Sequence, residues 1–220
     1  MGRDIAIEDA EFFRALSPDR LARVKPLLME KSFERQRVLY FEGSPADRLW
    51  VVRRGEVRLY KSSPSGQVTT LDVLGPGEVF GAISALEQGV YPSSAEAISD
   101  GSASWLKRDT FQRLMDEDPR LAVEILQIVS RRLRDAHDRL RSLAHDPAPR
   151  RVMLALLRAA PKGVAQVTRR ALAETAGTSV ETAIRVVRRL EVAGIVRGEV
   201  GRVEILDEEI LRKIAGSEVD

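Results

Sequence analysis

The length and composition of the chain exclude several classes of protein. Its 220 residues suffice for one large or two modest domains, each with a core of its own. No uninterrupted apolar run approaches the roughly 18 residues of a membrane span, so no membrane partner is expected. The chain has no cysteine and two histidines, which excludes thiolate metal sites and disfavours histidine ones. We therefore expect no catalytic residues, no metal and no cofactor, and, since the first ten residues lack a secretion signal, a cytoplasmic location.

The formal net charge of +2 conceals a basic segment in the last third of the chain. Residues 150–205 carry eleven Lys or Arg against five Glu, and Lys162 is one of the eleven. Such a local excess is typical of proteins that bind a phosphate backbone, although a solvated helical face gives the same count. The segment makes nucleic acid the first macromolecular partner to consider.

The first half of the chain predicts a lead-in helix followed by many short strands. Ser17 and Pro18 give a cap and first-turn signal, and apolar residues recur at helical spacing from Leu21 to Leu28. From Phe33 to Leu106 the sequence consists of short apolar runs separated by turn residues. Those turns include Gly43-Ser44-Pro45, Arg54-Gly55, Pro64-Ser65-Gly66 and Gly75-Pro76-Gly77. Regularly spaced short strands predict a β-sandwich or barrel.

A long heptad pattern lies between Asp118 and His145. Its apolar residues, spaced alternately by four and three, are Ala122, Leu126, Val129, Leu133, Ala136, Leu140 and Leu143. A single amphipathic helix packed on its own barrel is one interpretation, but such a narrow stripe suits a partner helix better. A symmetric homodimer is the commonest source of that partner. We predict a dimer seam formed by the five central residues, from Leu126 to Leu140.

Pro147 and Pro149 interrupt the helical pattern and indicate a hinge or domain boundary. Three parts are predicted on this basis. They are a barrel with its lead-in helix at residues 1–117, a dimerisation helix at 118–146, and a C-terminal domain at 147–220. A Pro161-Lys162-Gly163 loop follows the first helix of that last domain.

Residues 168–190 predict two short helices joined by a tight turn. Thr168 caps the first helix, Gly177 supplies the left-handed residue that ends it, and Ser179 caps the second helix. The residues available for a small shared core are Leu172, Ala176, Ala183, Val187 and Leu190. This arrangement is a helix-turn-helix, whose second helix enters the major groove of DNA.

The second helix carries residue types that read base pairs. Its predicted outer face consists of Val180, Glu181, Ile184, Arg185 and Arg188. Arginine donates two hydrogen bonds to guanine, and glutamate accepts one from cytosine. An internal Glu181–Arg185 ion pair, worth only about 0.2 to 0.5 kcal/mol, is the alternative. The predicted DNA-binding residues are Arg169, Ser179, Val180, Glu181, Thr182, Arg185 and Arg188.

Together, these regions resemble the CRP/FNR family of bacterial transcription regulators, and the resemblance covers nearly the whole chain. The segments that carry it are the run from Val38 to Tyr60, Gly75-Pro76-Gly77-Glu78-Val79-Phe80-Gly81, Leu106-Lys107-Arg108-Asp109-Thr110-Phe111, and Val180-Glu181-Thr182 with Arg185. The resemblance implies an α+β fold with an N-terminal jelly-roll barrel similar to cyclic-nucleotide-binding domains. It also implies a long dimerisation helix and a C-terminal winged helix-turn-helix, with Arg197 and Arg202 in the wing. The implied function is a transcription regulator, an activator, a repressor or both, that binds a palindromic promoter site as a homodimer and contacts RNA polymerase.

The resemblance further implies an effector pocket in the barrel. Its expected residues are Gly77, Glu78, Gly81, Ala82, Ser93, Ser94 and Arg131. In relatives that bind a cyclic nucleotide, a glutamate holds the ribose at the position of Ala82, and an arginine holds the phosphate near Ser93. Residues 62–106 contain no Lys or Arg, so a phosphate here would depend on backbone N–H groups or on Arg131 or Arg132. We expect independence from cyclic AMP, with an unknown effector or none; gating by a cyclic nucleotide or another small molecule is the alternative.

Two other classes of function remain as alternatives. A cupin-like barrel enzyme needs a histidine-rich metal site inside its barrel, but no histidine precedes His137. His137 and His145 lie late in the long helix, where a haem ligand near the barrel is not expected. A dimeric scaffold whose terminal helices bind another protein is the second alternative, and the basic helix-turn-helix disfavours it.

Overall fold

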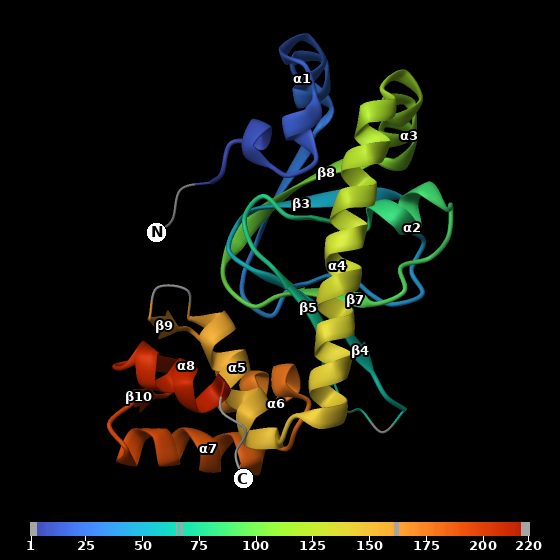
Figure 1. Ribbon diagram of the computed structural model, residues 1–220. Coiled ribbons are helices and arrows are strands. Elements are labelled where there is room, and N and C mark those ends of the chain that lie inside the picture. Colours follow the sequence, from blue (N-terminus) through green and yellow to red (C-terminus); the bar gives the residue numbers. More distant parts are fainter. Residues whose placement is uncertain (1–3, 65, 67, 161–162, 217–220) are drawn as a thin grey trace. The chain divides into compact units, whose positions relative to one another are not determined.

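The fold is described from a computed structural model of the chain (Figure 1). The structure describes residues 4–64, 66, 68–160 and 163–216. Parts of two predicted turns and of the basic segment lie outside these ranges, namely Ser65, Pro161 and Lys162. The chain divides into two compact units, one up to Arg134 and one from Asp135 onward. None of the helices in the described ranges is long and apolar enough to cross a membrane.

The first unit contains two four-stranded antiparallel sheets. One sheet has the order β1-β8-β3-β6 and the other the order β2-β7-β4-β5. The strands are β1 (Met29–Phe33), β2 (Val38–Tyr40), β3 (Arg48–Arg54), β4 (Val57–Ser62), β5 (Val68–Leu74), β6 (Val79–Phe80), β7 (Ser94–Ala97) and β8 (Gly101–Lys107). The helices of this unit are η1 (Ile7–Asp9), η2 (Phe13–Ala15), α1 (Pro18–Val24), η3 (Lys25–Leu27), α2 (Ala82–Leu86), α3 (Arg108–Glu117) and the first part of α4 (Pro119–His145).

Strand β3 shows how the sequence builds two cores from one sheet. Its residues from Leu49 to Val52 are all buried, because both faces of the strand are covered. Trp50 and Val52 pack into the core between the two sheets, whereas Leu49 and Val51 pack toward the N-terminal segments, α3 and α4. The predicted α+β fold, with a barrel, a long helix and a helix-turn-helix, is confirmed.

The predicted lead-in helix is shorter than its apolar pattern suggests. Helix α1 ends at Val24, a short 3-10 turn follows, and β1 already begins at Met29. Pro26 explains the early end, because it lacks the backbone N–H that would continue the α-helix. Leu27 and Leu28 therefore lie outside the helix.

Helix α4 has two apolar faces. Leu121, Ile125 and Ile128 are buried against the barrel. The predicted seam lies on a different face, where Leu126 is 63% exposed, Leu133 54% and Leu140 63% within a single chain. Val129 is also exposed, and Ala136 is half-buried. The helix thus both packs on its own barrel and presents a second, uncovered apolar stripe.

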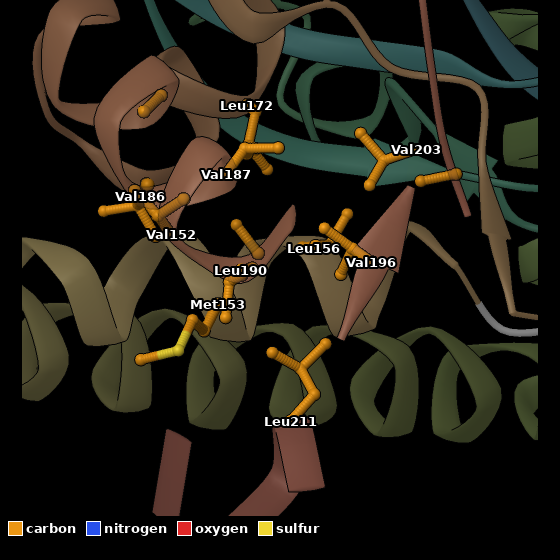
Figure 2. Close-up of a cluster of buried hydrophobic side chains, with 14 of the residues drawn as sticks. Val152, Met153, Leu156, Leu172, Val186, Val187, Leu190, Val196, Val203 and Leu211 are labelled. Atoms are coloured by element: carbon orange, nitrogen blue, oxygen red, sulfur yellow. The ribbon is translucent and has the colours of Figure 1, made fainter. Parts of the chain in front are cut away.

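The second unit is a small helical domain with a three-stranded sheet. Its elements are the last part of α4, α5 (Ala148–Ala159), β9 (Val164–Ala165), α6 (Arg169–Ala176), α7 (Val180–Val192), β10 (Val196–Glu199), β11 (Arg202–Ile205) and α8 (Glu208–Gly216). The sheet has the order β10-β11-β9. Figure 2 shows the core, where Leu156 of α5, Leu172 of α6, Val187 of α7 and Val203 of β11 are fully buried.

The expected break near Pro147 is present, because α4 ends at His145 and α5 begins at Ala148. The compact C-terminal unit nevertheless starts at Asp135, inside α4. The last turns of α4 pack with this unit: Leu143 lies against Gly177, at the end of α6. The unit is therefore larger than the predicted 147–220 part.

Candidate nucleic-acid interface and effector cavity

The two helices α6 and α7 are set by local capping. The Thr168 hydroxyl accepts a hydrogen bond from the Ala171 N–H, and the Ser179 hydroxyl accepts one from the Thr182 N–H. Gly177 ends α6 with φ of 60°, a left-handed conformation that glycine adopts without strain. The predicted shared core is buried as expected: Leu172, Ala176, Ala183, Val187 and Leu190.

Arg151 of α5 fixes the turn between these helices from outside. Its Nε donates to the Ala176 carbonyl and its Nη2 to the Gly177 carbonyl, both at 2.9 Å. Its Nη1 donates to the Asp146 carbonyl at 2.8 Å. The turn is thus held against the end of α4. Sequence reasoning missed this residue, because nothing local links Arg151 to a turn 25 residues later.

One stripe of α7 forms an open hollow on the surface. Its lining consists of Glu181, Ile184, Arg185, Arg188, Arg189 and Val192. Their spacing of three or four residues places them on one helix face. Within the described part of the chain, the three arginines have no acidic partner. We call these six residues the α7 stripe; it is a cationic surface with one carboxylate near its N-terminal end.

Glu181 and Arg185 are held separately. Arg185 Nη2 donates to the Thr182 hydroxyl at 3.2 Å, and the same hydroxyl lies 3.2 Å from the Ser179 hydroxyl. Hydrogen bonds from its own backbone N–H and from Ser179 lower the pKa of the Glu181 carboxyl, so it is ionised at neutral pH. Among the described residues, Glu181 and Arg185 form no ion pair with each other. The arginine fork and the carboxylate both remain available to a ligand.

Four of the seven predicted DNA-binding residues lie outside the open stripe: Arg169, Ser179, Val180 and Thr182. Ser179 and Thr182 form the capping hydrogen bond at the start of α7. Val180 is half-buried and packs on the domain core, because the first turn of α7 faces inward at this position. Arg169 is partly buried and its Nη2 lies 3.7 Å from the Glu191 carboxylate. In place of Val180, the stripe includes Arg189 and Val192. Continuing the three-and-four spacing from Glu181 along the sequence would have found both.

The hairpin of β10 and β11 is a wing whose charges are paired internally. Arg197 lies 3.6 Å from Glu204, and Arg202 lies 3.4 Å from Glu199. Gly198 lies against the ends of the Glu191 and Arg169 side chains, which would have to move to admit a Cβ there. Among the described residues, the wing arginines are therefore paired with acids, whereas the three arginines of the α7 stripe are not.

A second candidate site is a cavity of about 130 Å³ in the first unit. Its lining residues are Tyr40, Leu59, Val79, Phe80, Gly81, Ala82, Ile83, Ser84, Tyr91, Pro92, Ser93, Ile125, Ile128, Val129 and Arg132. The rings of Tyr40 and Tyr91 stack with centroids 3.7 Å apart. Burial raises the pKa of both phenols, so both are neutral. The cavity is mainly apolar and aromatic.

Three of the seven predicted pocket residues line this cavity: Gly81, Ala82 and Ser93. The other four lie outside its lining. Glu78 accepts a hydrogen bond from the Gly75 N–H at 2.7 Å, and Ser94 accepts one from the Glu42 N–H at 2.9 Å. Gly77 packs against the N-terminal segment.

Arg132, rather than Arg131, reaches the cavity. Arg131 is half exposed and pairs with Glu11. Arg132 donates to the Val79 carbonyl and lies 3.5 Å from Glu11. The difference follows from helix geometry, because successive residues point about 100° apart and the barrel side of α4 is set by Ile125 and Ile128.

The comparisons with known proteins agree with this two-part organisation. Residues 30–118 match the model of the cyclic nucleotide-binding domain, and residues 150–214 match that of the Crp-like helix-turn-helix domain. Among solved structures, FixK2 from Bradyrhizobium japonicum matches with a TM-score of 0.77 at 26% identity, over 87% of this chain and 99% of that one. A CRP/FNR family regulator from Thermus thermophilus matches with a TM-score of 0.75 at 28% identity, over 87% and 100%.

Curated relatives extend the match over almost the full length. The cyclic AMP receptor protein of Thermus thermophilus is 32% identical over 95% of this chain and 98% of its own. A CRP-like cAMP-activated global transcriptional regulator of Mycobacterium tuberculosis is 28% identical over 96% and 99%. These relatives are transcription regulators and not enzymes. The chain therefore belongs to the CRP/FNR family of transcription regulators, with a helix-turn-helix DNA-binding domain.

Proposed function

We propose that this regulator binds a two-fold symmetric DNA site as a homodimer and reads it with the α7 stripe. The observation that carries the proposal is the stripe itself: one helix face on which Glu181 and Arg185 stand beside two further unpaired arginines. Arg185 is the candidate donor to guanine and Glu181 the candidate acceptor from cytosine. Arg188 and Arg189 are suited to the phosphates that flank those bases.

The uncovered seam of α4 supports the homodimer. Leucines at positions 126, 133 and 140 are each more than half exposed in a single chain, at heptad spacing on a long helix. A second copy of α4 would cover them. A dimer with two recognition helices matches half-sites about one helical turn apart, roughly 34 Å. RNA polymerase is the further partner proposed, with action in the cytoplasm and no enzymatic activity.

We also propose that cyclic AMP does not control this protein, although relatives at 32% and 28% identity are named for cyclic AMP. The cavity of about 130 Å³ is well below the roughly 300 to 1,000 Å³ of pockets for larger ligands. Ala82 offers no group to a ribose hydroxyl. In the described lining Arg132 is the one charged side chain, and its Nη2 is already taken by Val79 and Glu11, so it cannot offer its full fork to a phosphate. Cyclic-nucleotide gating is the second candidate, supported by those relatives.

Selection of bound sequences from random DNA, with no nucleotide added, tests the proposal. We expect an inverted repeat with half-sites that contain a G·C pair, and by family resemblance a TGA core. Repeating the selection with cyclic AMP should give the same sequences and the same yield. Recovery of DNA without an inverted repeat would contradict the dimer model. Recovery only in the presence of cyclic AMP would establish the second candidate.

A further inference from the structure

The cavity of the first unit is lined by three polar groups that no described residue satisfies, and one of them is a fully buried atom. Ser84 is 8% exposed and Ser93 is 6% exposed, and both line the cavity. Neither hydroxyl forms a hydrogen bond with any described residue. The Nε of Arg132, also in the lining, is buried and likewise has no partner. Three hydrogen-bonding groups on one small cavity are thus unused by the protein.

An unsatisfied buried donor such as the Arg132 Nε is unfavourable, so it indicates that something else occupies the cavity. Leaving such a group unsatisfied costs about 1 to 3 kcal/mol, and native proteins satisfy nearly all of them. Ordered water is one occupant to consider. Most of the lining, however, is apolar: Leu59, Val79, Phe80, Ile83, Ile125, Ile128 and Val129. Because each water needs two to four polar partners, the three polar groups can hold about one water, which leaves the apolar part of the lining uncovered.

The charge of the lining indicates which polar group a bound ligand carries. Arg132 is the one charged side chain in the described lining, and no carboxylate is part of it. Its Nε and the two serine hydroxyls give the lining three possible donors. A carboxylate accepts such bonds strongly, because hydrogen bonds to an ionised group are about twice as strong as neutral ones. A cation would find no counter-charge there.

The volume of the cavity limits the size of the apolar part of the ligand. A cavity of about 150 Å³ lined by apolar side chains binds benzene in another protein, and this one measures about 130 Å³. By this comparison it accommodates about five or six non-hydrogen atoms. A short or branched chain with one carboxylate meets both limits, whereas a nucleotide exceeds them.

We propose that this cavity binds a small monocarboxylate with a compact apolar body. Arg132 Nε, Ser84 and Ser93 hold the carboxylate, and the α4 side chains Ile125 and Ile128 cover the apolar part. The proposal names the ligand class of the effector site, and its regulatory part rests on the proposed function. Val129 provides the link, because it lines the cavity and also belongs to the α4 seam. Occupancy would therefore alter the packing of the seam.

Titration calorimetry on the purified full chain, without DNA, tests the binding directly. The probes are isobutyrate and propionate, with isobutyramide as the neutral analogue of the first, and cyclic AMP. We expect dissociation constants of about 10 µM to 1 mM for the acids. The amide should bind at least about tenfold more weakly, because it lacks the charge. Cyclic AMP should not bind in this range.

Paired arginine variants test the residue assignment. Arg132→Gln should weaken isobutyrate binding about tenfold or more. Arg131→Gln removes a neighbouring arginine that pairs with the same Glu11 but does not line the cavity, and it should leave binding within about twofold. Ser93→Ala, a smaller change, should weaken binding about threefold to tenfold and covers the case that Arg132→Gln fails to fold.

The outcomes separate this proposal from the DNA-binding function. No heat from either acid up to about 10 mM would mean a water-filled cavity and would overturn the proposal. Equal binding of acid and amide, or equal effects of the two arginine variants, would overturn the carboxylate assignment. Sedimentation with and without isobutyrate measures whether the bound acid changes dimerisation through the seam. Because calorimetry uses no DNA, acid binding can succeed even if the selection experiment fails, and the reverse also holds.

Discussion

Placing a charge in the α4 seam should dissociate the dimer. Leu133 is 54% exposed in the single chain and lies at the centre of the seam, so Leu133→Arg is the sharpest perturbation. Full burial of a leucine contributes about 1.5 to 3 kcal/mol. About half of the Leu133 side chain remains to be buried in the dimer. Replacing it therefore removes about 1 to 1.5 kcal/mol of dimerisation free energy per protomer.

The symmetry of the dimer doubles this loss. An isologous interface contains two copies of residue 133, so the total is about 2 to 3 kcal/mol, before any cost of desolvating the new charges. At about 1.4 kcal/mol per factor of ten, the dimer dissociation constant should rise about 30- to 150-fold. The central location of the residue makes this a lower bound, because an unpaired buried charge adds its own penalty.

Analytical ultracentrifugation over a range of micromolar concentrations measures the change. The matched control is Gln127→Arg, which adds the same side chain to an exposed position of the same helix, about 100° away from Leu126. The control should keep the native dimer. A wild-type chain that is monomeric at these concentrations, or a Leu133→Arg chain of unchanged mass, would refute the seam.

Three further predictions concern stability. Gly177→Ala should lower the free energy of unfolding of the C-terminal unit by about 1 to 3 kcal/mol in urea, because its φ is +60° and its Cβ would lie 2.6 Å from Leu143; an unchanged midpoint would contradict this. Ser179→Ala should lower the free energy of unfolding by about 1 kcal/mol, because it removes the cap of α7. Ser179→Thr should retain most of the stability that the cap provides. Hydrogen bonds from Arg120 hold the pKa of Asp118 at about 2, below its unfolded value of about 3.9. Its contribution to stability is therefore complete above about pH 4 and lost as the pH falls through about 2; Asp118→Asn should flatten this part of a melting-temperature profile, and a profile identical to wild type would be the contrary result.

The elements that sequence predicts well are those fixed by neighbouring residues. The caps at Thr168 and Ser179 and the left-handed Gly177 act within a few residues of their own helices, and all three are as expected. The strand-rich texture between Phe33 and Leu106 likewise becomes two antiparallel sheets. In each case the periodicity or the turn residue is sufficient by itself.

Features that depend on distant packing are not predictable in this way. Arg132 takes the place expected of Arg131, because the rotation of α4 is decided by which side chains meet the barrel. Arg169 is paired with Glu191 by the fold of α6 against α7, which its charge alone does not indicate. The unpaired hydroxyl of Ser84 depends on the absence of neighbours, and no sequence pattern reports that.

The central claim is that the α7 stripe reads base pairs through Arg185. The most direct measurement compares wild-type and Arg185→Ala binding to the selected operator and to an operator whose contacted G·C pair is replaced by A·T in both half-sites. The binding free energy of the wild type should weaken by about 1 to 3 kcal/mol per replaced pair. The Arg185→Ala protein should instead bind both operators with nearly equal affinity. Arg188→Ala, the control, should weaken both and keep the preference. An Arg185→Ala protein that discriminates between the operators as strongly as wild type would contradict the account.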